Sequence, residues 1–256
     1  MKTQFFQLES EFAAFFESLH LDHFAAWWNA DIERVDEPNL TRGGRSEVGQ
    51  LSIPVSGQRQ TFYLKRQTNY NCRTPGSPLR GIPVALREWQ KINWLKKQGI
   101  QTLEVVCVGR ESLSEDRAIL ATAALEQFSP FDVWLARPMP DRERAKGLRA
   151  LGQLIGRLHA AGVKHGCLYA KHIYFSDHDS TELRLIDLEK CKRIFSRWAG
   201  LRDLDTLLRH SPSLSQDECR LLYAAYNEAS PYPWSLASLE QAVMRRMHAK
   251  GAARDD

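Results

Sequence analysis

The chain has 256 residues, of which 43% are hydrophobic and 26% charged, a balance typical of a folded globular protein rather than a disordered one. Its formal net charge of +4 suits an anionic ligand but is too small by itself to indicate nucleic acid, so no nucleic-acid partner is expected. No apolar run approaches the roughly 18–20 residues of a membrane span, and the N-terminus lacks a long apolar signal core.

The sequence contains five cysteines, an odd number without a C-x-x-C pair: Cys72, Cys107, Cys167, Cys191 and Cys219. This spacing indicates neither a disulfide framework nor a zinc-finger pattern. We therefore expect reduced thiols in a cytoplasmic protein, and no zinc site.

The first 30 residues are rich in aromatic side chains, among them Phe5, Phe6, Phe15 and Trp27. One interpretation is a helix that lies on a membrane surface. The polar positions between the aromatic residues are mainly acidic, however, and an anionic leaflet would repel such a face. We therefore favour helices that pack on the rest of the protein, with at most peripheral membrane contact.

Strand patterns dominate the following part of the chain. Strands are predicted at residues 48–55, 61–65, 103–108 and 118–124, with a turn at 56–59 and a Pro- and Gly-rich loop at 69–82. Pro83 and Gly99 are favoured first and last residues for the helix expected between them.

Helical patterns dominate the second half. Leu148, Leu151, Ile155 and Leu158 are spaced three, four and three residues apart, which places them on one face of a helix. Gly162 is suited to end that helix. Two short strands are expected at 173–175 and 183–188, and mainly helix at 200–250.

The order of these elements predicts the fold class. A sheet-rich front followed by a helix-rich back favours an α+β protein with two lobes and a cleft between them. We expect an N-lobe at residues 1–128 and a C-lobe at 129–256, with residues 131–138 crossing between them.

The stretch around Gly43 and Gly44 is a candidate phosphate-binding loop. Glycines let backbone N–H groups approach a phosphate, and Arg42 and Arg45 add positive charge. The run is neither G-x-G-x-x-G nor a Walker loop, so an ordinary hairpin turn is the alternative.

Lys65 ends the strand TFYLK and could reach phosphate oxygens, although a solvated strand end is the simpler interpretation. Glu88 shares a helix face with Ile92 and Leu95, and a carboxylate on an apolar face needs a buried partner. We expect Lys65 to be that partner; the alternative is that Glu88 lies beside the apolar face and contacts water.

The run GVKHGCLYAKHI, residues 162–173, leads into a predicted hairpin that ends in LRLIDLEK. This arrangement places His172 and Asp187 together, where a metal ion that bridges phosphates could bind. His165 could act as a ligand or base, but we favour a role in which it packs and braces the loop.

Together these features resemble the protein-kinase pattern of a strand lysine, a helix glutamate, H-R-D-L-x-x-x-N and D-F-G. The counterparts are Lys65, Glu88, the run His165-Gly166-Cys167-Leu168 with His172, and Asp187-Leu188-Glu189. Residue 172 follows residue 167 by five positions, as Asn follows Asp in the pattern. The resemblance implies a bilobal protein-kinase-like fold.

His172 in place of Asn, the ending IDLEK and the RGGR loop resemble the bacterial lipopolysaccharide core kinases (the Kdo/WaaP family), particularly the InaA-like branch. The resemblance covers roughly residues 30–210. It implies cytoplasmic transfer of the ATP γ-phosphoryl group, with Mg²⁺, to a sugar hydroxyl of the lipopolysaccharide inner core.

The same resemblance implies a role for each matching residue. Lys65, oriented by Glu88, would hold the α- and β-phosphates, and His172 with Asp187 would bind Mg²⁺. Asp203 would brace the catalytic loop.

Cys167 departs from the pattern because it occupies the position of the catalytic base. A thiol with an ordinary pKa near 8.5 is mostly protonated at neutral pH and replaces a carboxylate poorly. Loss of a general base typically costs about 10²–10⁴-fold in rate. Phosphoryl transfer depends mainly on positioning and charge neutralisation, so the loss need not be total.

Three functions are therefore compatible with the sequence. The favoured hypothesis is a kinase of the lipopolysaccharide core, in which Cys167, His165 and Asp187 are the candidate catalytic residues. The second is a pseudokinase that senses nucleotide or binds a partner in envelope stress or lipopolysaccharide assembly. The third is a small-molecule phosphotransferase like the aminoglycoside kinases. In the first two cases we expect a cytoplasmic protein, at most peripheral to the inner membrane.

Overall fold

The computed structural model describes residues 3–41, 43–55, 58–74, 76–194, 196–231 and 233–252. Arg42 of the glycine loop and the turn positions Ser56 and Gly57 lie outside these ranges. The chain forms two compact units, one of Met1–Trp94 with Leu103–Ala124 and the other of Leu95–Thr102 with Leu125–Asp256. Among the described residues, no helix is long and apolar enough to cross a membrane.

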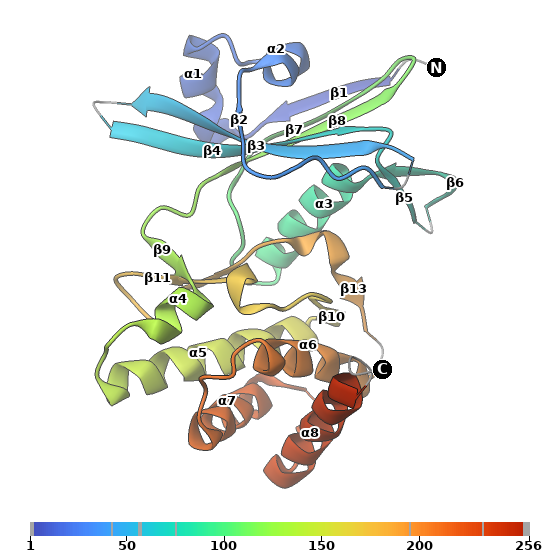
Figure 1. Ribbon diagram of the computed structural model, residues 1–256. Helices are drawn as coiled ribbons and strands as arrows, with labels where there is room; N and C mark the ends of the chain where they lie inside the picture. The colour runs from blue at the N-terminus through green and yellow to red at the C-terminus, as the bar shows by residue number, and fades with distance from the viewer. Residues whose placement is uncertain are drawn as a thin grey trace. The chain divides into compact units, whose positions relative to one another are not determined.

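The first unit contains a six-stranded antiparallel sheet with the strand order β1-β7-β8-β4-β3-β2 (Figure 1). Its strands are β1 (Thr3–Leu8), β2 (Glu33–Arg34), β3 (Arg45–Val55), β4 (Gln58–Thr68), β7 (Val105–Ser112) and β8 (Asp116–Ala123). Strand β4 is internal, and Lys65 on it pairs with Val48 of β3 and Leu120 of β8. Neighbours on both sides therefore fix the position of Lys65.

The aromatic N-terminus packs against this sheet, as expected. Helices α1 (Ser10–Ser18) and α2 (Phe24–Asn29) bury Phe16, Phe24 and Trp27 in a cluster with Phe62 of β4. The rings of Phe16 and Trp27 lie 4.8 Å apart between centroids. Most of the aromatic surface that could have contacted a membrane is therefore inside the unit.

Two expectations for the first unit are wrong. Residues 3–8 form strand β1 rather than a helix, because the edge of β7 satisfies their backbone groups and their side chains alternate between faces: Phe6 and Leu8 pack in the core, while Phe5 contacts Trp89. The expected loop at 69–82 contains a hairpin of β5 (Asn71–Thr74) and β6 (Ser77–Pro83).

Helix α3 (Val84–Lys97) follows directly after Pro83, as predicted, and lies on the opposite face of the sheet from α1 and α2 (Figure 1). Ile92 and Leu95 are fully buried. Gly99 just beyond the helix has a φ of +72°, the left-handed conformation that commonly ends a helix. The apolar face of α3 thus carries Glu88 inward.

The second unit is mainly helical. Its helices are α4 (Phe131–Ala136), α5 (Asp141–Ala160), α6 (Arg197–Arg209), α7 (Gln216–Ala229) and α8 (Leu236–Ala252), with 3₁₀ turns η1 (Ala170–His172) and η2 (Leu188–Lys190). Short strands β9 (Phe128–Pro130), β10 (Val163–Lys164), β11 (Ile173–Ser176), β12 (Leu183–Leu185) and β13 (Lys192–Arg193) complete it.

The predicted apolar face of α5 is confirmed, because Leu148, Leu151, Ile155 and Leu158 are all buried. The predicted crossing segment at 131–138 is wrong. Residues 131–136 form α4, where aromatic side chains stack on Phe175 of β11 inside the second unit.

Helix α5 packs very closely on α7 through two glycines that face it. A Cβ added at Gly152 would lie 2.4 Å from the backbone oxygen of Leu222, and one added at Gly156 would lie 2.6 Å from that of Tyr226. Contacts this short leave no room for a methyl group. The two glycines therefore set the distance between α5 and α7 in the second unit.

We predict that Gly156→Ala destabilises the protein by about 1–3 kcal/mol. An alanine normally favours a helix by about 1 kcal/mol over glycine, but the clash with backbone of α7 outweighs this gain. Urea unfolding measures the change, with Arg149→Ala on the exposed side of α5 as the matched control, expected within about 0.5 kcal/mol of wild type. A stabilised Gly156→Ala variant would contradict the close packing.

Candidate functional site

The predicted pairing of Lys65 with Glu88 is confirmed. Lys65 Nζ lies 2.5 Å from Glu88 Oε2, and only 4% of the Glu88 side chain and 19% of the Lys65 side chain are exposed. The pair joins the internal strand β4 to helix α3. Breaking a buried pair by removal of one partner is costly, so each residue holds the other in place.

The glycine loop is a tight turn between β2 and β3. The Gly44 N–H donates to the Thr41 carbonyl oxygen, and Gly43 adopts a φ of +74°. A Cβ at Gly44 would lie 2.4 Å from the backbone of Thr68 and Asn69, so only glycine fits there. The turn lines a shallow hollow together with Arg45, whose guanidinium lies 2.7 Å from Glu47. In this conformation the Gly44 N–H already donates within the turn and is not available to a phosphate.

In the second unit, the loop that follows β10 is held by Asp203 of helix α6. One carboxylate oxygen of Asp203 accepts from the His165 backbone N–H at 2.6 Å, and the other accepts from the Gly166 N–H at 2.9 Å. The His159 Nε2 atom lies 3.1 Å from the same carboxylate. The expectation that Asp203 braces the loop is confirmed.

Two residues that support Asp203 were missed by the sequence analysis. The buried ring of His159 bridges Asp203 and the hydroxyl of Tyr226, 3.0 Å away. Gly200 makes room for this ring, since a Cβ there would lie 2.6 Å from His159 Nδ1. The position of His159 four residues after Ile155, on the buried face of α5, was the available signal.

His165 is fully buried, which favours the bracing role over a catalytic one. Its Nε2 lies 2.9 Å from the Ile186 carbonyl oxygen, so this nitrogen carries the hydrogen and Nδ1 is left as an acceptor. Burial lowers the pKa of His165, and the neutral ring is therefore favoured. The ring ties the loop to the segment that precedes Asp187.

Cys167, His172 and Asp187 come together at the end of this loop. The Cys167 Sγ atom lies 3.4 Å from Asp187 Oδ2 and 3.6 Å from His165 Nδ1. The His172 Nε2 atom lies 3.6 Å from the same Asp187 oxygen. Asp187 adopts the left-handed conformation with a φ of +57°, which aspartate tolerates better than most residues.

The environment of Cys167 keeps its thiol protonated. Burial and the negative charge of Asp187 both raise the pKa of this thiol far above its ordinary value. The residue is only 3% exposed. A neutral buried thiol donates a hydrogen bond to its neighbours and does not accept a proton, so Cys167 as it stands here cannot serve as the general base.

The three side chains differ in how well they suit Mg²⁺, which prefers oxygen ligands in an octahedral arrangement and keeps waters or nucleotide phosphates around it. The Asp187 carboxylate fits, and 31% of its side chain is exposed. The imidazole of His172 and the thiol of Cys167 are softer donors that Mg²⁺ does not favour. Asp187 is therefore the residue best suited to hold a magnesium-bound nucleotide.

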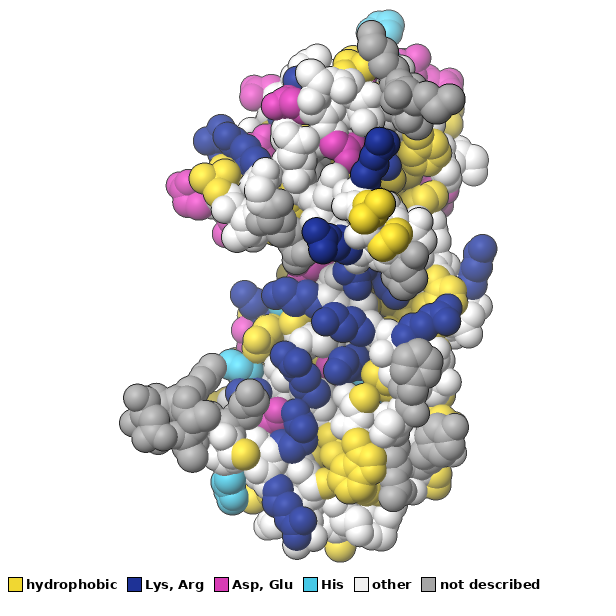
Figure 2. Space-filling view, turned by 90° about the vertical axis from the view of Figure 1, so that its right-hand side faces the viewer, with side chains coloured by type: hydrophobic (Ala, Val, Ile, Leu, Met, Phe, Trp, Pro, Cys, Tyr) yellow, Lys and Arg dark blue, Asp and Glu magenta, His cyan; other side chains and the backbone are white. Residues whose placement is uncertain are grey.

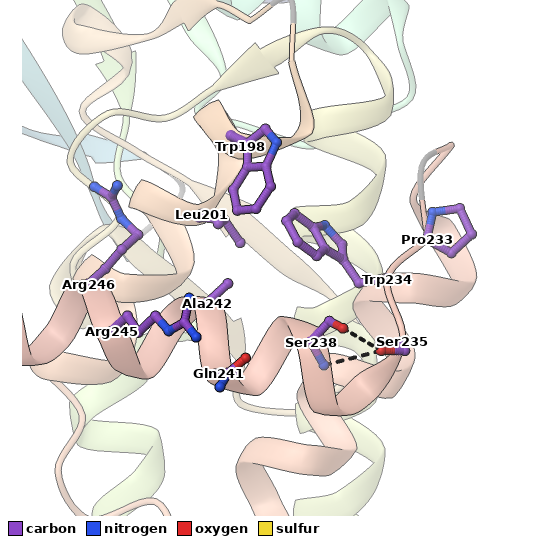
Figure 3. Close-up of a pocket in the computed structure, with 10 residues that line it drawn as sticks. All are labelled: Trp198, Leu201, Pro233, Trp234, Ser235, Ser238, Gln241, Ala242, Arg245 and Arg246. Atoms are coloured by element: carbon purple, nitrogen blue, oxygen red, sulfur yellow. Dashed lines mark hydrogen bonds between the residues drawn. The ribbon is translucent and has the colours of Figure 1, made fainter.

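A separate hollow of about 530 Å³ lies between α6, α8 and the segment that joins α7 to α8 (Figure 3). On one side of it the rings of Trp198 and Trp234 pack edge to face, with their centroids 4.7 Å apart. Arg245 extends along the other side. The sequence analysis named none of these residues. Because Trp198 and Asp203 both belong to α6, this hollow shares a helix with the residue that braces the loop.

Comparison with known proteins identifies the family. Residues 25–226 match the model of the family described as "Lipopolysaccharide kinase (Kdo/WaaP) family". The chain belongs to this family. Its protein-kinase-like α+β fold, with one sheet-rich and one helical unit, agrees with this membership.

Relatives in the family support the same assignment. Protein InaA of Escherichia coli (strain K12) is 28% identical over 217 residues, which cover 81% of this chain and 98% of InaA. The lipopolysaccharide core heptose(I) kinase WaaP of Pseudomonas aeruginosa is 29% identical over 126 residues, 43% of this chain and 46% of WaaP. The match to InaA along nearly its whole length agrees with the InaA-like branch.

A solved structure shows the same fold. The structure described as WaaP in complex with acyl carrier protein superimposes with a TM-score of 0.68 at 21% identity, and covers 97% of this chain and 98% of its own. Family membership thus supports a kinase-like function connected with lipopolysaccharide.

Removal of the Asp203 charge should loosen the loop. We predict that Asp203→Asn lowers the free energy of unfolding by about 1–3 kcal/mol, because an amide cannot accept from both backbone N–H groups and His159 as a carboxylate does. Urea unfolding provides the measurement. Asp217→Asn is the control, since the Asp217 side chain is 95% exposed.

The Asp203→Asn variant should also change how the free energy of unfolding depends on pH in the acid range. Although burial alone would raise the pKa of Asp203, its hydrogen bond to His159 and the bonds from the loop hold the pKa below the ordinary 3.8. This contribution to stability is present at neutral pH and is lost as pH falls through the folded-state pKa. Equal acid sensitivity of wild type and Asp203→Asn would contradict the bracing role.

Proposed function

We propose that this protein is an ATP-dependent phosphotransferase that acts on a sugar hydroxyl of the lipopolysaccharide inner core, with Cys167 at the position of the usual base. The observation that carries the proposal is the buried ion pair between Lys65 and Glu88. An internal strand lysine held by a helix glutamate is the arrangement with which protein kinases hold the phosphates of ATP.

Each candidate residue would have its own role toward the nucleotide. In the first unit, Lys65 would hold the α- and β-phosphates, Glu88 would orient Lys65, and the turn at Gly43, Gly44 and Arg45 would cover the phosphates after its internal hydrogen bond opens. In the second unit, Asp187, with His172 beside it, would hold the magnesium of Mg²⁺-ATP. When bound, this ion would neutralise charge on the phosphates.

Exposed basic residues near the loop suit an anionic acceptor. Lys171, Lys190, Lys192 and Arg193 are all exposed, and the last three follow Asp187 within six residues. Figure 2 shows Lys and Arg side chains gathered over the helical unit on the side that carries β13. A positive surface raises the local concentration of a phosphorylated or carboxylated saccharide. We place the reaction in the cytoplasm, at most peripheral to the inner membrane.

A specific observation favours a second candidate, a pseudokinase. Cys167 is buried and protonated, so the loop lacks the carboxylate that would accept the proton of the acceptor hydroxyl. The protein would then use nucleotide as a signal and bind a partner in envelope stress or lipopolysaccharide assembly. Acyl carrier protein is the first partner to test, because the structurally similar WaaP was solved with it. Family membership disfavours the third hypothesis, a small-molecule phosphotransferase.

Nucleotide binding tests both candidates. We predict that Lys65→Ala and Asp187→Ala each weaken Mg²⁺-ATP binding by at least about thirtyfold, because each removes a charge that faces the phosphates. Isothermal titration calorimetry gives the affinities. Lys96→Ala and Asp217→Ala, at exposed positions, should bind like wild type.

Thermal unfolding of each variant separates a lost ligand contact from a lost fold, which matters most for Lys65→Ala because it leaves Glu88 buried without its partner. Folded Lys65→Ala and Asp187→Ala variants with unchanged ATP affinity would remove the basis for the nucleotide site.

Restoring the carboxylate tests whether position 167 faces the acceptor hydroxyl. If position 167 faces the acceptor hydroxyl, Cys167→Asp should raise phosphate transfer to lipopolysaccharide core fragments by about 10²–10⁴-fold, the usual contribution of a general base. Transfer of ³²P from γ-labelled ATP measures this rate. Cys167→Ser, which matches the thiol in shape but supplies no carboxylate, should give no rise. A Cys167→Asp variant as slow as Cys167→Ser would mean that position 167 does not approach the acceptor hydroxyl, or that these fragments are not the acceptor.

A further inference from the structure

One group of side chains has the composition of a zinc site, whereas the sequence indicated only that His172 and Asp187 could bind a metal ion that bridges phosphates. The Cys167 Sγ atom, a ring nitrogen of His172 and an Asp187 carboxylate oxygen all lie within 4.8 Å of one another. Among the described ranges, no other three His, Cys, Asp or Glu side chains converge in this way. The sequence contains no C-x-x-C pair to indicate zinc, because these three ligands come from a loop, a 3₁₀ turn and the residue before another 3₁₀ turn.

The hydrogen bond of His172 directs its second nitrogen at this cluster. His172 Nδ1 lies 2.8 Å from the Cys167 carbonyl oxygen and donates to it, which leaves Nε2 as the nitrogen that faces the cluster. Nε2 lies 3.6 Å from an Asp187 carboxylate oxygen. A cation between these two atoms would be attracted to the carboxylate and could be bound by the nitrogen.

The donor types select among cations. Thiolate sulfur, imidazole nitrogen and one carboxylate oxygen are ligands that Zn²⁺ favours, whereas Mg²⁺ and Ca²⁺ favour oxygen alone. The cysteine at the base position supplies the donor that makes this difference. We propose that Cys167, His172 and Asp187 bind Zn²⁺ in the nucleotide-free protein.

The spacing of the three atoms supports zinc. Tetrahedral zinc with usual bond lengths to sulfur, nitrogen and oxygen places its ligand atoms about 3.4–3.6 Å apart. Two of the three separations are 3.4 Å for sulfur to oxygen and 3.6 Å for nitrogen to oxygen. The third separation, between sulfur and nitrogen, is at most 4.8 Å, so the closing of this one gap is the main movement that the ion requires.

The surroundings also match those of known zinc sites. A zinc-ligating histidine normally donates its other N–H to a carbonyl or carboxylate, as His172 does to Cys167. The partly exposed Asp187 gives the ion a route from solvent. Binding replaces the hydrogen of the Cys167 thiol, which leaves to solvent as a proton, so affinity should rise with pH. Three protein ligands leave one tetrahedral position for water.

This inference goes beyond the proposed function and does not require it, because the zinc site uses no nucleotide and no residue of the first unit. The two proposals share Asp187. Zn²⁺ and Mg²⁺-ATP should therefore compete, and the metal content of the cell would then influence whether the protein binds nucleotide.

The experiment is a titration of nucleotide-free, metal-stripped protein with Zn²⁺ in competition with a chromophoric chelator. Wild type should bind one equivalent. Cys167→Ser should bind it at least about 100-fold more weakly, since even loss of a supporting residue around a metal ligand costs 10–100-fold. Cys219→Ser is the matched control, because Cys219 lies on α7 and is absent from the cluster. It should bind zinc like wild type.

Cobalt provides a readout of the sulfur ligand itself. Co²⁺-loaded wild type and Cys219→Ser should show a sulfur-to-cobalt charge-transfer band in the near ultraviolet, and Cys167→Ser should lack it. Absence of stoichiometric zinc binding in wild type, or equal affinity and an equal cobalt band in Cys167→Ser, would overturn the proposal. Mg²⁺-ATP binding is measured separately on wild type, so the zinc site and the nucleotide site can each fail alone.

Discussion

The loop that carries the candidate chemistry depends on one buried carboxylate. Asp203 accepts hydrogen bonds from two consecutive backbone N–H groups, those of His165 and Gly166, and is held from the other side by His159. Burial of a charge is costly unless hydrogen bonds satisfy it, and here the loop itself supplies them. The loop and α6 consequently fix each other's positions.

A second constraint on the same loop explains why it needs glycine beside its histidine. Gly166 has a φ of +85°, and a Cβ there would lie 2.8 Å from the Lys190 backbone oxygen. The close approach brings the segment after Asp187 against the loop and places the Asp187 carboxylate 3.4 Å from the Cys167 sulfur. The geometry around the base position is thus set by backbone packing and is retained although the residue there is a cysteine.

Replacement of a carboxylate by a thiol changes what this geometry can do. A carboxylate at position 167 would accept a proton from an acceptor hydroxyl, whereas the buried thiol beside Asp187 keeps its own. With this thiol, the site offers sulfur, nitrogen and oxygen donors instead of the oxygen ligands that Mg²⁺ prefers. If both proposals hold, cysteine at position 167 weakens acid–base chemistry and at the same time favours a softer metal ion.

Much of this organisation was predictable from sequence, because it depends on local patterns. The spacing of Leu148, Leu151, Ile155 and Leu158 identified the buried face of α5, and Glu88 on an apolar face indicated its need for a buried cation. Strand β1 was not predictable, since its conformation depends on pairing with β7, about a hundred residues away. The spacing on α5 places His159 on the buried face but does not reveal its partners Asp203 and Tyr226, and the contact of the Cys167 sulfur with Asp187 likewise depends on tertiary structure.

The proposed function requires that the groups assigned to the phosphates bind nucleotide although the carboxylate base is absent. Calorimetric titration of the unmodified protein with ATP tests this, first after removal of all divalent ions by a chelator and then with Mg²⁺ restored. We expect saturable binding that depends on Mg²⁺. Absence of binding in both conditions would contradict it, and would mean that the chain retains the family's fold without a nucleotide site.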